Sequence, residues 1–397
     1  MSTAPQDPIV ILGAARTPMG GFQGDFAGLA AHDLGGVAIQ AAVERAGIAP
    51  ELVGEVLFGN CLMAGQGQAP ARQAAFKGGL PKSAGAVTLS KMCGSGMKAA
   101  MLAHDMLLAG THEVMVAGGM ESMTNAPHLL PKGRSGIRIG HDRVMDHMML
   151  DGLEDAYEAG RSMGTFGEDC AAKYGFTREE QDQFAVTSVS RAQAATQSGA
   201  FQAEIAPVTV KTRAGEQRIA VDEGPGKIKL DKIPTLKPAF KKDGTITAAS
   251  SSSINDGAAA LVLARASTAQ RLGAKPIARI VAHTTHAQEP NWFATAPVGA
   301  TQKLLAKAGW SVADVDLWEI NEAFAVVPMA LMTELGLSHD IVNVNGGACA
   351  LGHPIGASGA RIMVTLIHAL QARGKKRGVA TLCIGGGEAT ALALELL

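Results

Sequence analysis

Val114-Met115-Val116-Ala117-Gly118-Gly119 is an apolar run that ends in two glycines, and Leu382-Cys383-Ile384-Gly385-Gly386 has the same form near the end of the chain. Short apolar runs of this kind are typical of strands that are buried on both faces. Two such strands, each followed by a glycine turn, indicate that one structural unit occurs twice.

The residues that lead up to the two runs agree in order and spacing. In the first half a strand begins at Pro8, a helix ends at Gly47, a strand ends at Asn60 and a helix opens at Ser95; the corresponding residues of the second half are Pro276, Gly309, Asn321 and Ser358. The steps from Gly to Asn are 13 and 12 residues long, and the steps from Asn to Ser are 35 and 37. The sequence therefore predicts an α/β protein with two repeated βαβ-rich halves.

The stretch between the halves has a different character, with Met- and His-rich sequence at residues 145–149 and a polar helix predicted from Thr177 to Ser198. Apolar sequence resumes at Asn255. Because 397 residues are too many for one compact core, we expect several domains. They are an N-terminal α/β core domain of residues 1–122 and 255–275, an inserted loop or lid domain of residues 123–254, and a C-terminal α/β core domain of residues 276–397.

Composition limits the classes of partner and compartment. A formal net charge of −1 gives the whole molecule no long-range attraction to nucleic acid or to an anionic membrane. No apolar run reaches the ~18 residues of a membrane span, and residues 1–7 show neither region of a secretory leader. The five cysteines form no C-x-x-C pair, which favours a reducing compartment, so we expect a cytoplasmic protein. We expect no metal site, since Gly and Pro disfavour the helix through which Cys349 and His353 would chelate an ion.

Cys93 follows a strand-like run, residues 84–92, and directly precedes Gly94-Ser95-Gly96 and a helical stretch. Its sulfur is therefore expected at a helix N-terminus, where unpaired N–H groups favour an anion and lower a thiol pKa from its usual ~8.5. A nucleophilic thiolate is one interpretation. A small buried thiol in a strand-to-helix turn is the other.

His353 lies in the most distinctive segment of the chain, residues 345–361. The glycines of this segment and Pro354 hold the imidazole on a rigid loop, as a general base requires. The alternative is a core histidine in a phosphate loop, although the Gly-Lys-Ser/Thr ending of such loops is missing. Cys383 before a glycine turn and Asn321 at a strand end add polar groups at matching strand ends of the two halves.

Over essentially its whole length the chain resembles the thiolase family, most closely the acetyl-CoA acetyltransferases. The motifs that carry the resemblance are residues 93–96 (Cys-Gly-Ser-Gly), 118–123 (Gly-Gly-Met-Glu-Ser-Met), 321–325 (Asn-Glu-Ala-Phe-Ala), the loop 345–361 and residues 383–387 (Cys-Ile-Gly-Gly-Gly). The resemblance implies a layered α-β-α-β-α fold with an inserted loop domain. It also implies the reversible, ping-pong Claisen condensation of two acetyl-CoA molecules to acetoacetyl-CoA and CoA through an acyl-cysteine.

The resemblance also assigns roles to single residues. Cys93 accepts the acyl group, His353 activates it, and Cys383 moves the α-proton of the second acyl-CoA. Asn321 positions a water that stabilises the enolate oxygen together with His353, while the N–H groups of Cys93 and Gly385 form the other oxyanion hole. The implied contacts with substrate and CoA are Met163, Lys227, Phe240, Ala248, Ser252, Phe293 and Phe324.

Coenzyme A is substrate and product in this reaction, so no cofactor is implied. Six lysines between Lys227 and Lys242, against one acid, suit the adenosine 3′-phosphate, although a solvated face explains them equally well. The family suggests a homotetramer, a dimer of dimers, and we expect the apolar segment Ile137 to Leu150 to mediate contact between subunits.

The sequence departs from the family pattern at four positions. Ser162 replaces a common His beside the pantetheine arm, and Ser253 replaces a common Gly in the loop that flanks it. Ala389 stands where a Gly is common in the last turn, and Cys349 stands where Ile or Val is common, which favours a core role.

Two other functions remain open. A broader 3-ketoacyl-CoA thiolase of fatty-acid degradation is the alternative within the family, and the sequence fixes neither acyl-chain length nor direction nor pathway. An NAD-dependent oxidoreductase is the remote alternative, because residues 94–99 formally match a dinucleotide-binding fingerprint with Glu113 about twenty residues on.

Overall fold

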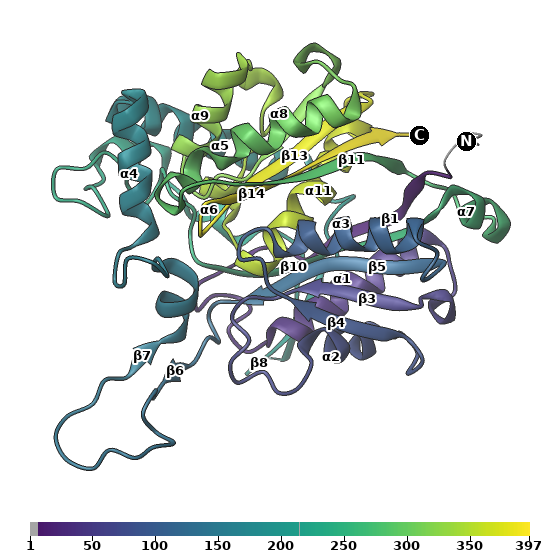
Figure 1. The fold of residues 1–397 in the computed structure, drawn as a ribbon, viewed down its shortest axis with the longest axis horizontal. Coiled ribbons are helices and arrows are strands. Elements are labelled where there is room, and N and C mark those ends of the chain that lie inside the picture. The colour runs from purple at the N-terminus through teal and green to yellow at the C-terminus, as the bar shows by residue number, and fades with distance from the viewer. Residues whose placement is uncertain (1–6, 214) are drawn as a thin grey trace.

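One ten-stranded sheet runs through both halves of the chain in the computed structural model, which describes residues 7–213 and 215–397 (Figure 1). The expectation that residues 1–7 lack the features of a secretory leader concerns residues outside the described part of the chain, except for Asp7. In the first half the strands are β1 (Ile9–Arg16), β3 (Glu55–Gly59), β4 (Gly85–Leu89), β5 (Val114–Ser122) and β10 (Asn255–Arg265). In the second half they are β11 (Ala278–Ala287), β12 (Leu317–Ile320), β13 (Arg377–Ile384) and β14 (Glu388–Leu396).

The two halves repeat the same strand order. The order is β4-β3-β5-β10-β1 in the first half and β12-β13-β14-β11 in the second, so each pair such as β5 and β13 occupies the same place. A single parallel bridge between Trp318 and Val342 stands where β4 stands in the first half. The halves meet where β1 pairs antiparallel with β11, at Val10 with Arg279 and Ile11 with Ala278. The predicted repeat is therefore confirmed.

Helices form three layers around the folded-over sheet, as Figure 1 shows. The middle layer consists of α3 (Ser95–Leu108) and α11 (Ile355–Ala372), which pack on each other and on strands of both halves. The outer layers are α1 (Ala31–Ala46) with α2 (Pro70–Lys77), and α8 (Ala296–Ala308) with α9 (Val326–Leu335). This is the expected α-β-α-β-α arrangement.

The helix expected to open at Ser358 begins three residues earlier, at Ile355, so that detail of the repeat is wrong. Pro354 is the N-cap of α11, and a proline at a helix start sacrifices no intrahelical hydrogen bond. Ser358 consequently lies inside the first turns of α11, where it faces the loop that precedes the helix.

The segment between the halves holds short strands together with helices, of which the longest has 21 residues. They are β6 (His128–Leu129), β7 (Met145–Asp146), α4 (Met163–Tyr174), α5 (Arg178–Ser198), β8 (Val208–Thr212), β9 (Gly215–Ile219) and α6 (Glu223–Lys227); elsewhere lie β2 (Gly20–Gly21), α7 (Ala266–Leu272) and α10 (Ala348–Leu351). The arm between β6 and β7 projects away from the layers (Figure 1), and its Ile139 is 96% exposed. No helix in the described part of the chain is long and apolar enough to cross a membrane.

Candidate active site

Three of the five predicted catalytic residues line one cavity between the two halves. Cys93 comes from the turn between β4 and α3, His353 from the loop before α11, and Gly385 from the turn between β13 and β14. The predicted substrate contacts Met163, Ser252, Phe293 and Phe324 line the same cavity. Residues almost 300 positions apart in the sequence therefore meet because α3 and α11 pack together in the middle layer.

The Cys93 thiol is protonated in the resting protein. Met92 adopts φ of +45°, which turns the chain from the strand into the helix that begins at Ser95. Burial raises the pKa of the Cys93 thiol to about 11, more than hydrogen bonds from the backbone N–H groups of Gly385 and Cys93 lower it. The expected thiolate at neutral pH is wrong, since loss of hydration outweighs the helix N-terminus. Cys93 therefore needs a base.

His353 is held in the form that a base requires. The Ser358 hydroxyl donates to the carbonyl oxygen of Pro354 at 2.9 Å, so its oxygen is left to accept the Nδ1–H of His353 at 2.5 Å. The ring nitrogen Nε2 then carries the lone pair, and it is buried without a partner among the described residues. Burial, helped by Arg361, lowers the pKa of His353 to about 3, so the imidazole is neutral at pH 7.

Two fully buried carboxylates fix the loop around His353. Glu322 accepts hydrogen bonds from the Cys349 N–H at 2.9 Å and from the Asn343 amide at 2.7 Å. Glu121, which belongs to the first half, accepts a hydrogen bond from the Gly356 N–H of the second half at 2.9 Å. Both ends of the loop are thus tied to the strand ends of the repeat, which keeps the imidazole in one position.

Cys383 and Asn321 lie on the neighbouring strand ends. Cys383 is fully buried, and its pKa is raised well above the ordinary value, mainly by burial and also by the nearby Cys93. The side chain of Asn321 is fully buried, and neither its Oδ1 nor its Nδ2 has a hydrogen-bond partner among the described residues. A buried amide with no partner is costly, so both polar atoms of Asn321 are left able to bind a further polar group.

A second cavity adjoins the first and shares Met163, Ser252, Phe324 and His353 with it. Phe240, another predicted contact, lines this cavity. So do Ser162 and Ser253, two of the positions at which the sequence differs from the family pattern. Two predicted contacts lie elsewhere. Ala248 is exposed, and Lys227 is on the surface in an ion pair with Glu223, outside both cavities.

The other departures from the family pattern fit the fold locally. Ala389 is buried in β14 opposite Cys383, and the preceding turn is formed by Gly386 and Gly387, whose φ values are +92° and +85°. Cys349 packs in a core cluster with Phe184, so it does not form a chelating pair with His353.

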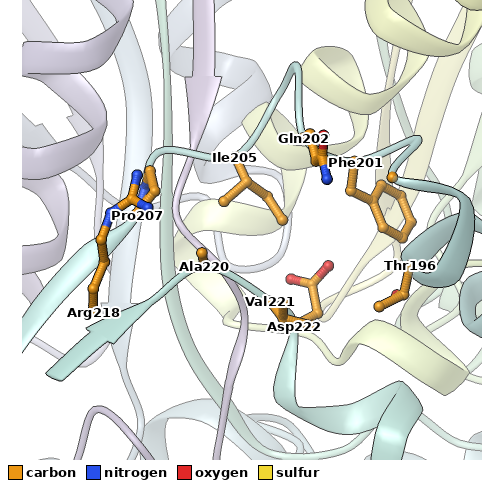
Figure 2. Close-up of a pocket in the computed structure, with 10 residues that line it drawn as sticks. Thr196, Phe201, Gln202, Ile205, Pro207, Arg218, Ala220, Val221 and Asp222 are labelled. Atoms are coloured by element: carbon orange, nitrogen blue, oxygen red, sulfur yellow. The ribbon is translucent and has the colours of Figure 1, made fainter.

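A cavity of about 370 Å³ elsewhere holds none of the predicted site residues (Figure 2). Phe201 and Ile205 form part of its wall, and Figure 2 shows the Asp222 carboxylate below these two side chains, in the loop that follows Ala220 and Val221. That carboxylate is bound by both NH groups of the buried Arg16, at 2.6 and 2.9 Å. The Arg16–Asp222 ion pair therefore neutralises the charge of Asp222 and ties the insert to the end of β1.

The dinucleotide interpretation finds no support in the geometry. Residues 94–99 open α3 in the middle layer, directly behind Cys93. Glu113, the expected ribose ligand, instead pairs with Arg271 at 2.6 Å on the surface.

Sequence reasoning missed Ser358, Glu121 and Glu322 as positioning residues. Each belongs to a motif that was recognised, because Glu322 follows Asn321 and Glu121 lies in the run after Gly118. A charged residue inside an otherwise apolar strand run was the available signal, since carboxylates are almost never buried without partners.

The comparisons with known proteins agree along the whole chain. The family model of the thiolase N-terminal domain matches residues 9–267, and that of the thiolase C-terminal domain matches residues 274–396. An acetyl-CoA acetyltransferase of Chromobacterium violaceum is 50% identical over 390 residues, covering 98% of this chain and 99% of the relative. Acetyl-CoA acetyltransferase 2 of Arabidopsis thaliana is 50% identical over 399 residues, covering 100% and 98%.

Solved structures agree as well. The acetyl-CoA acetyltransferase of Bacillus anthracis superposes with a TM-score of 0.96 at 41% identity, covering 99% of each chain. A thiolase from Ascaris suum, solved in complex with coenzyme A, gives a TM-score of 0.93 at 42% identity, covering 98% of this chain and 100% of that one. With its fold, its repeat and both family models in agreement, the chain belongs to the thiolase family.

Proposed function

We propose that the protein is an acetyl-CoA C-acetyltransferase, which condenses two acetyl-CoA molecules reversibly to acetoacetyl-CoA and CoA. The observation that carries the proposal is that one cavity is lined by a partly buried thiol, Cys93, and by a neutral histidine, His353, whose Nε2 has no hydrogen-bond partner in the described chain. The names of the similar proteins support the same reaction.

In the first half-reaction Cys93 becomes acetylated. The Nε2 atom of His353 takes the thiol proton as the sulfur attacks the thioester carbonyl, and the proton then passes to the departing CoA sulfur. One thioester bond forms and one breaks, so the step costs little free energy. The N–H groups of Cys93 and Gly385, which already reach the sulfur, are placed to bind the negative carbonyl oxygen.

In the second half-reaction a carbon–carbon bond forms. The thiolate form of Cys383, a minor species because burial raises the pKa of this thiol, removes an α-proton from the second acetyl-CoA. The enolate attacks the carbonyl carbon of acetyl-Cys93, the Cys93 sulfur leaves as acetoacetyl-CoA forms, and this sulfur takes the proton from Cys383. The unpartnered amide of Asn321, through a bound water, stabilises the enolate oxygen. The role that the family resemblance gives His353 in this oxyanion hole requires a proton on Nε2, so in this step the imidazole acts in a form that carries Nε2–H. Separate groups serve the two oxygens because negative charge develops at a different atom in each half-reaction.

The pantetheine arm would lie along the adjoining cavity, between Met163, Phe240, Ser252 and Phe324. Phe293 closes the end near Cys93. In this proposal Lys227 and its neighbouring lysines, which do not line either cavity, would meet the CoA phosphates, whereas Ala248 would line the exposed edge. Coenzyme A acts here as substrate and product, with no further cofactor.

A broader 3-ketoacyl-CoA thiolase is the second candidate. It is favoured by the apolar wall of the adjoining cavity, where Met123, Met149 and Ile254 offer room for methylene groups. Thiolysis of 3-ketoacyl-CoA substrates of rising length separates the two functions. A rate that falls at least ~10-fold from four to eight carbons supports the acetyltransferase, and a flat profile supports the broader enzyme.

We also propose a cytoplasmic homotetramer, with the domain limits 122/123, 254/255 and 275/276 given above. The exposed apolar side chains of the β6–β7 arm, Ile137, Ile139 and Val144, would pack against another subunit. Light scattering that gives a monomer at micromolar concentration would reject this assembly.

The function itself is tested by thiolysis of acetoacetyl-CoA and by mapping of the labelled cysteine. We expect thiolysis, with iodoacetamide modifying Cys93 in step with loss of activity and acetyl-CoA protecting it. Cys170→Ala, at another buried free cysteine, is the matched control and should retain activity. Absence of thiolysis in folded protein would reject the proposal.

A further inference from the structure

Three metal-ligating side chains converge at a point that the proposed reaction does not use. His104 and Asp105 belong to the last turn of α3, and His283 lies on β11. His283 Nε2 is 3.0 Å from Asp105 Oδ1 and 3.2 Å from His104 Nδ1, while His104 Nδ1 is 3.0 Å from Asp105 Oδ1. These three atoms form a nearly equilateral triangle that opens into a cavity of about 450 Å³.

The geometry points to a binding site for a divalent transition-metal ion of the zinc class, and we propose that His104, Asp105 and His283 are its protein ligands. Two imidazoles and one carboxylate are a set that such ions accept. With metal–ligand distances of ~2.0–2.1 Å, neighbouring ligand atoms are separated by about 2.9 Å in an octahedral complex and about 3.3 Å in a tetrahedral one. The observed separations fall in that interval.

Hydrogen bonding alone accounts for only part of the arrangement. Each imidazole can donate one N–H to Asp105, which explains two sides of the triangle. The third side then sets two protonated ring nitrogens 3.2 Å apart. The rings of His104 and His283 are not stacked but meet at 85°, so their nitrogen edges, rather than their faces, converge. A cation bound by both lone pairs removes this conflict.

The surroundings also favour a cation. His104 and Asp105 lie at the C-terminal end of α3, where the unpaired carbonyl groups give the helix its negative end. The Asp105 side chain is 55% exposed, so an ion can reach the site from solvent.

Two cationic side chains line the same cavity. Arg279 is paired with Glu395, so its charge is compensated. Lys307 donates to the backbone carbonyl of His283 at 3.1 Å and opposes a bound cation. Lys307 therefore lowers the affinity of the site for a cation. Replacing Lys307 is a test in which the affinity should rise.

A bound ion would join the two repeated halves. His104 and Asp105 belong to the first half and His283 to the second, and the group lies toward the C-terminal end of α3, whereas Cys93 precedes its N-terminal end. Because an unfolded chain does not hold the three ligands together, binding stabilises the folded state. The expected result is a clamp between α3 and β11, not a step in acyl transfer.

The experiment is equilibrium dialysis of tag-free full-length protein against zinc chloride, after alkylation of Cys93 to remove its thiol as a ligand. We expect one tightly bound Zn²⁺ per chain and, at about 100 times the dissociation constant, a rise in Tm of about 3 °C. His104→Asn, Asp105→Asn and His283→Asn should each weaken binding by more than ~100-fold, the upper limit for loss of an outer-shell partner. Lys307→Met should strengthen binding several-fold.

His112→Asn is the matched control, because His112 pairs with one carboxylate, Glu55 at 2.9 Å, without a second imidazole in that pair. It should bind Zn²⁺ like the parent protein. Equal binding by the parent and the His104→Asn and Asp105→Asn variants would overturn the proposal, as would absence of stoichiometric binding in the parent. The use of the exposed Asp105 and the partly buried His104 keeps the test valid if His283→Asn does not fold.

Discussion

The oxygen of the Ser358 hydroxyl accepts the Nδ1–H of His353 while its own proton goes to the carbonyl of Pro354. One hydroxyl on the first turns of α11 thereby selects the tautomer in which Nε2 of His353 is the basic atom. The histidine and the residue that orients it are five positions apart, so their relation depends on α11 beginning at Ile355 and not at Ser358.

Ser358→Ala should lower kcat for thiolysis by about 10- to 100-fold, with a much smaller change in KM, since ring orientation matters most when the proton moves. Ser358→Thr should restore much of the activity, because it keeps the hydroxyl. Steady-state kinetics with acetoacetyl-CoA measure both. Thr365→Val, which removes another buried hydroxyl from α11, is the control. Equal losses in the Ser358 and Thr365 variants would assign Ser358 a purely structural role.

Alkylation of Cys93 should accelerate with pH without reaching a plateau below pH 9. With the pKa of the thiol raised to about 11, the thiolate fraction grows tenfold per pH unit up to that value. Pseudo-first-order rates of iodoacetamide modification between pH 6.5 and 9.5, followed by peptide mass spectrometry, provide the measurement. Free glutathione in the same buffers calibrates the reagent. A plateau below pH 8 would mean that the helix N-terminus dominates after all.

Cys93 and Cys383 should have separable tasks. Cys93→Ala should abolish thiolysis and covalent labelling by acetyl-CoA. Cys383→Ala should still acquire an acetyl adduct on Cys93, because acyl transfer needs only His353 and an oxyanion hole, but should lose synthesis and deuterium exchange at the acetyl-CoA methyl group. Intact-protein mass spectrometry and proton NMR in D₂O measure the two effects. Methyl exchange at the parental rate in Cys383→Ala would refute this division.

Replacing Lys227 and Lys229 by Glu should raise the KM for CoA substrates about 3- to 10-fold at low salt with little change in kcat, since phosphate contacts are equal in ground and transition states. The effect should shrink at 0.5 M salt. The Lys82→Glu/Lys275→Glu protein, with the same charge change at exposed lysines, should keep the parental KM. An unchanged KM in the Lys227/Lys229 variant would place the phosphate site elsewhere, consistent with the pairing of Lys227 with Glu223.

Much of the fold could be predicted because short stretches of sequence are enough to reveal the repeat. Buried β-branched runs and helix-ending glycines such as Gly47 and Gly309, both at positive φ, reveal strands and helices directly. The protonation state of Cys93 could not be predicted in the same way. The position of Cys93 at a helix N-terminus can be predicted from the neighbouring sequence. The loss of hydration of its thiol depends on packing against segments near Ile384 and Gly385, almost 300 residues away. The grouping of His104, Asp105 and His283 has the same nonlocal origin.

Equivalent asparagines in the two halves of the repeat differ in their hydrogen bonds. Asn60 and Asn321 stand at equivalent strand ends, yet Asn60 donates to Glu121 at 2.5 Å and accepts from Gln66 at 3.0 Å, whereas the side chain of Asn321 has no partner among the described residues. One copy of this asparagine is held by its neighbours, and the other is left able to take the role proposed for it in the reaction. Two identical units would have the same hydrogen bonds at this position. Because the two copies have diverged within one chain, the fold has a rigidly held amide in one half and an amide without a partner among the described residues in the other.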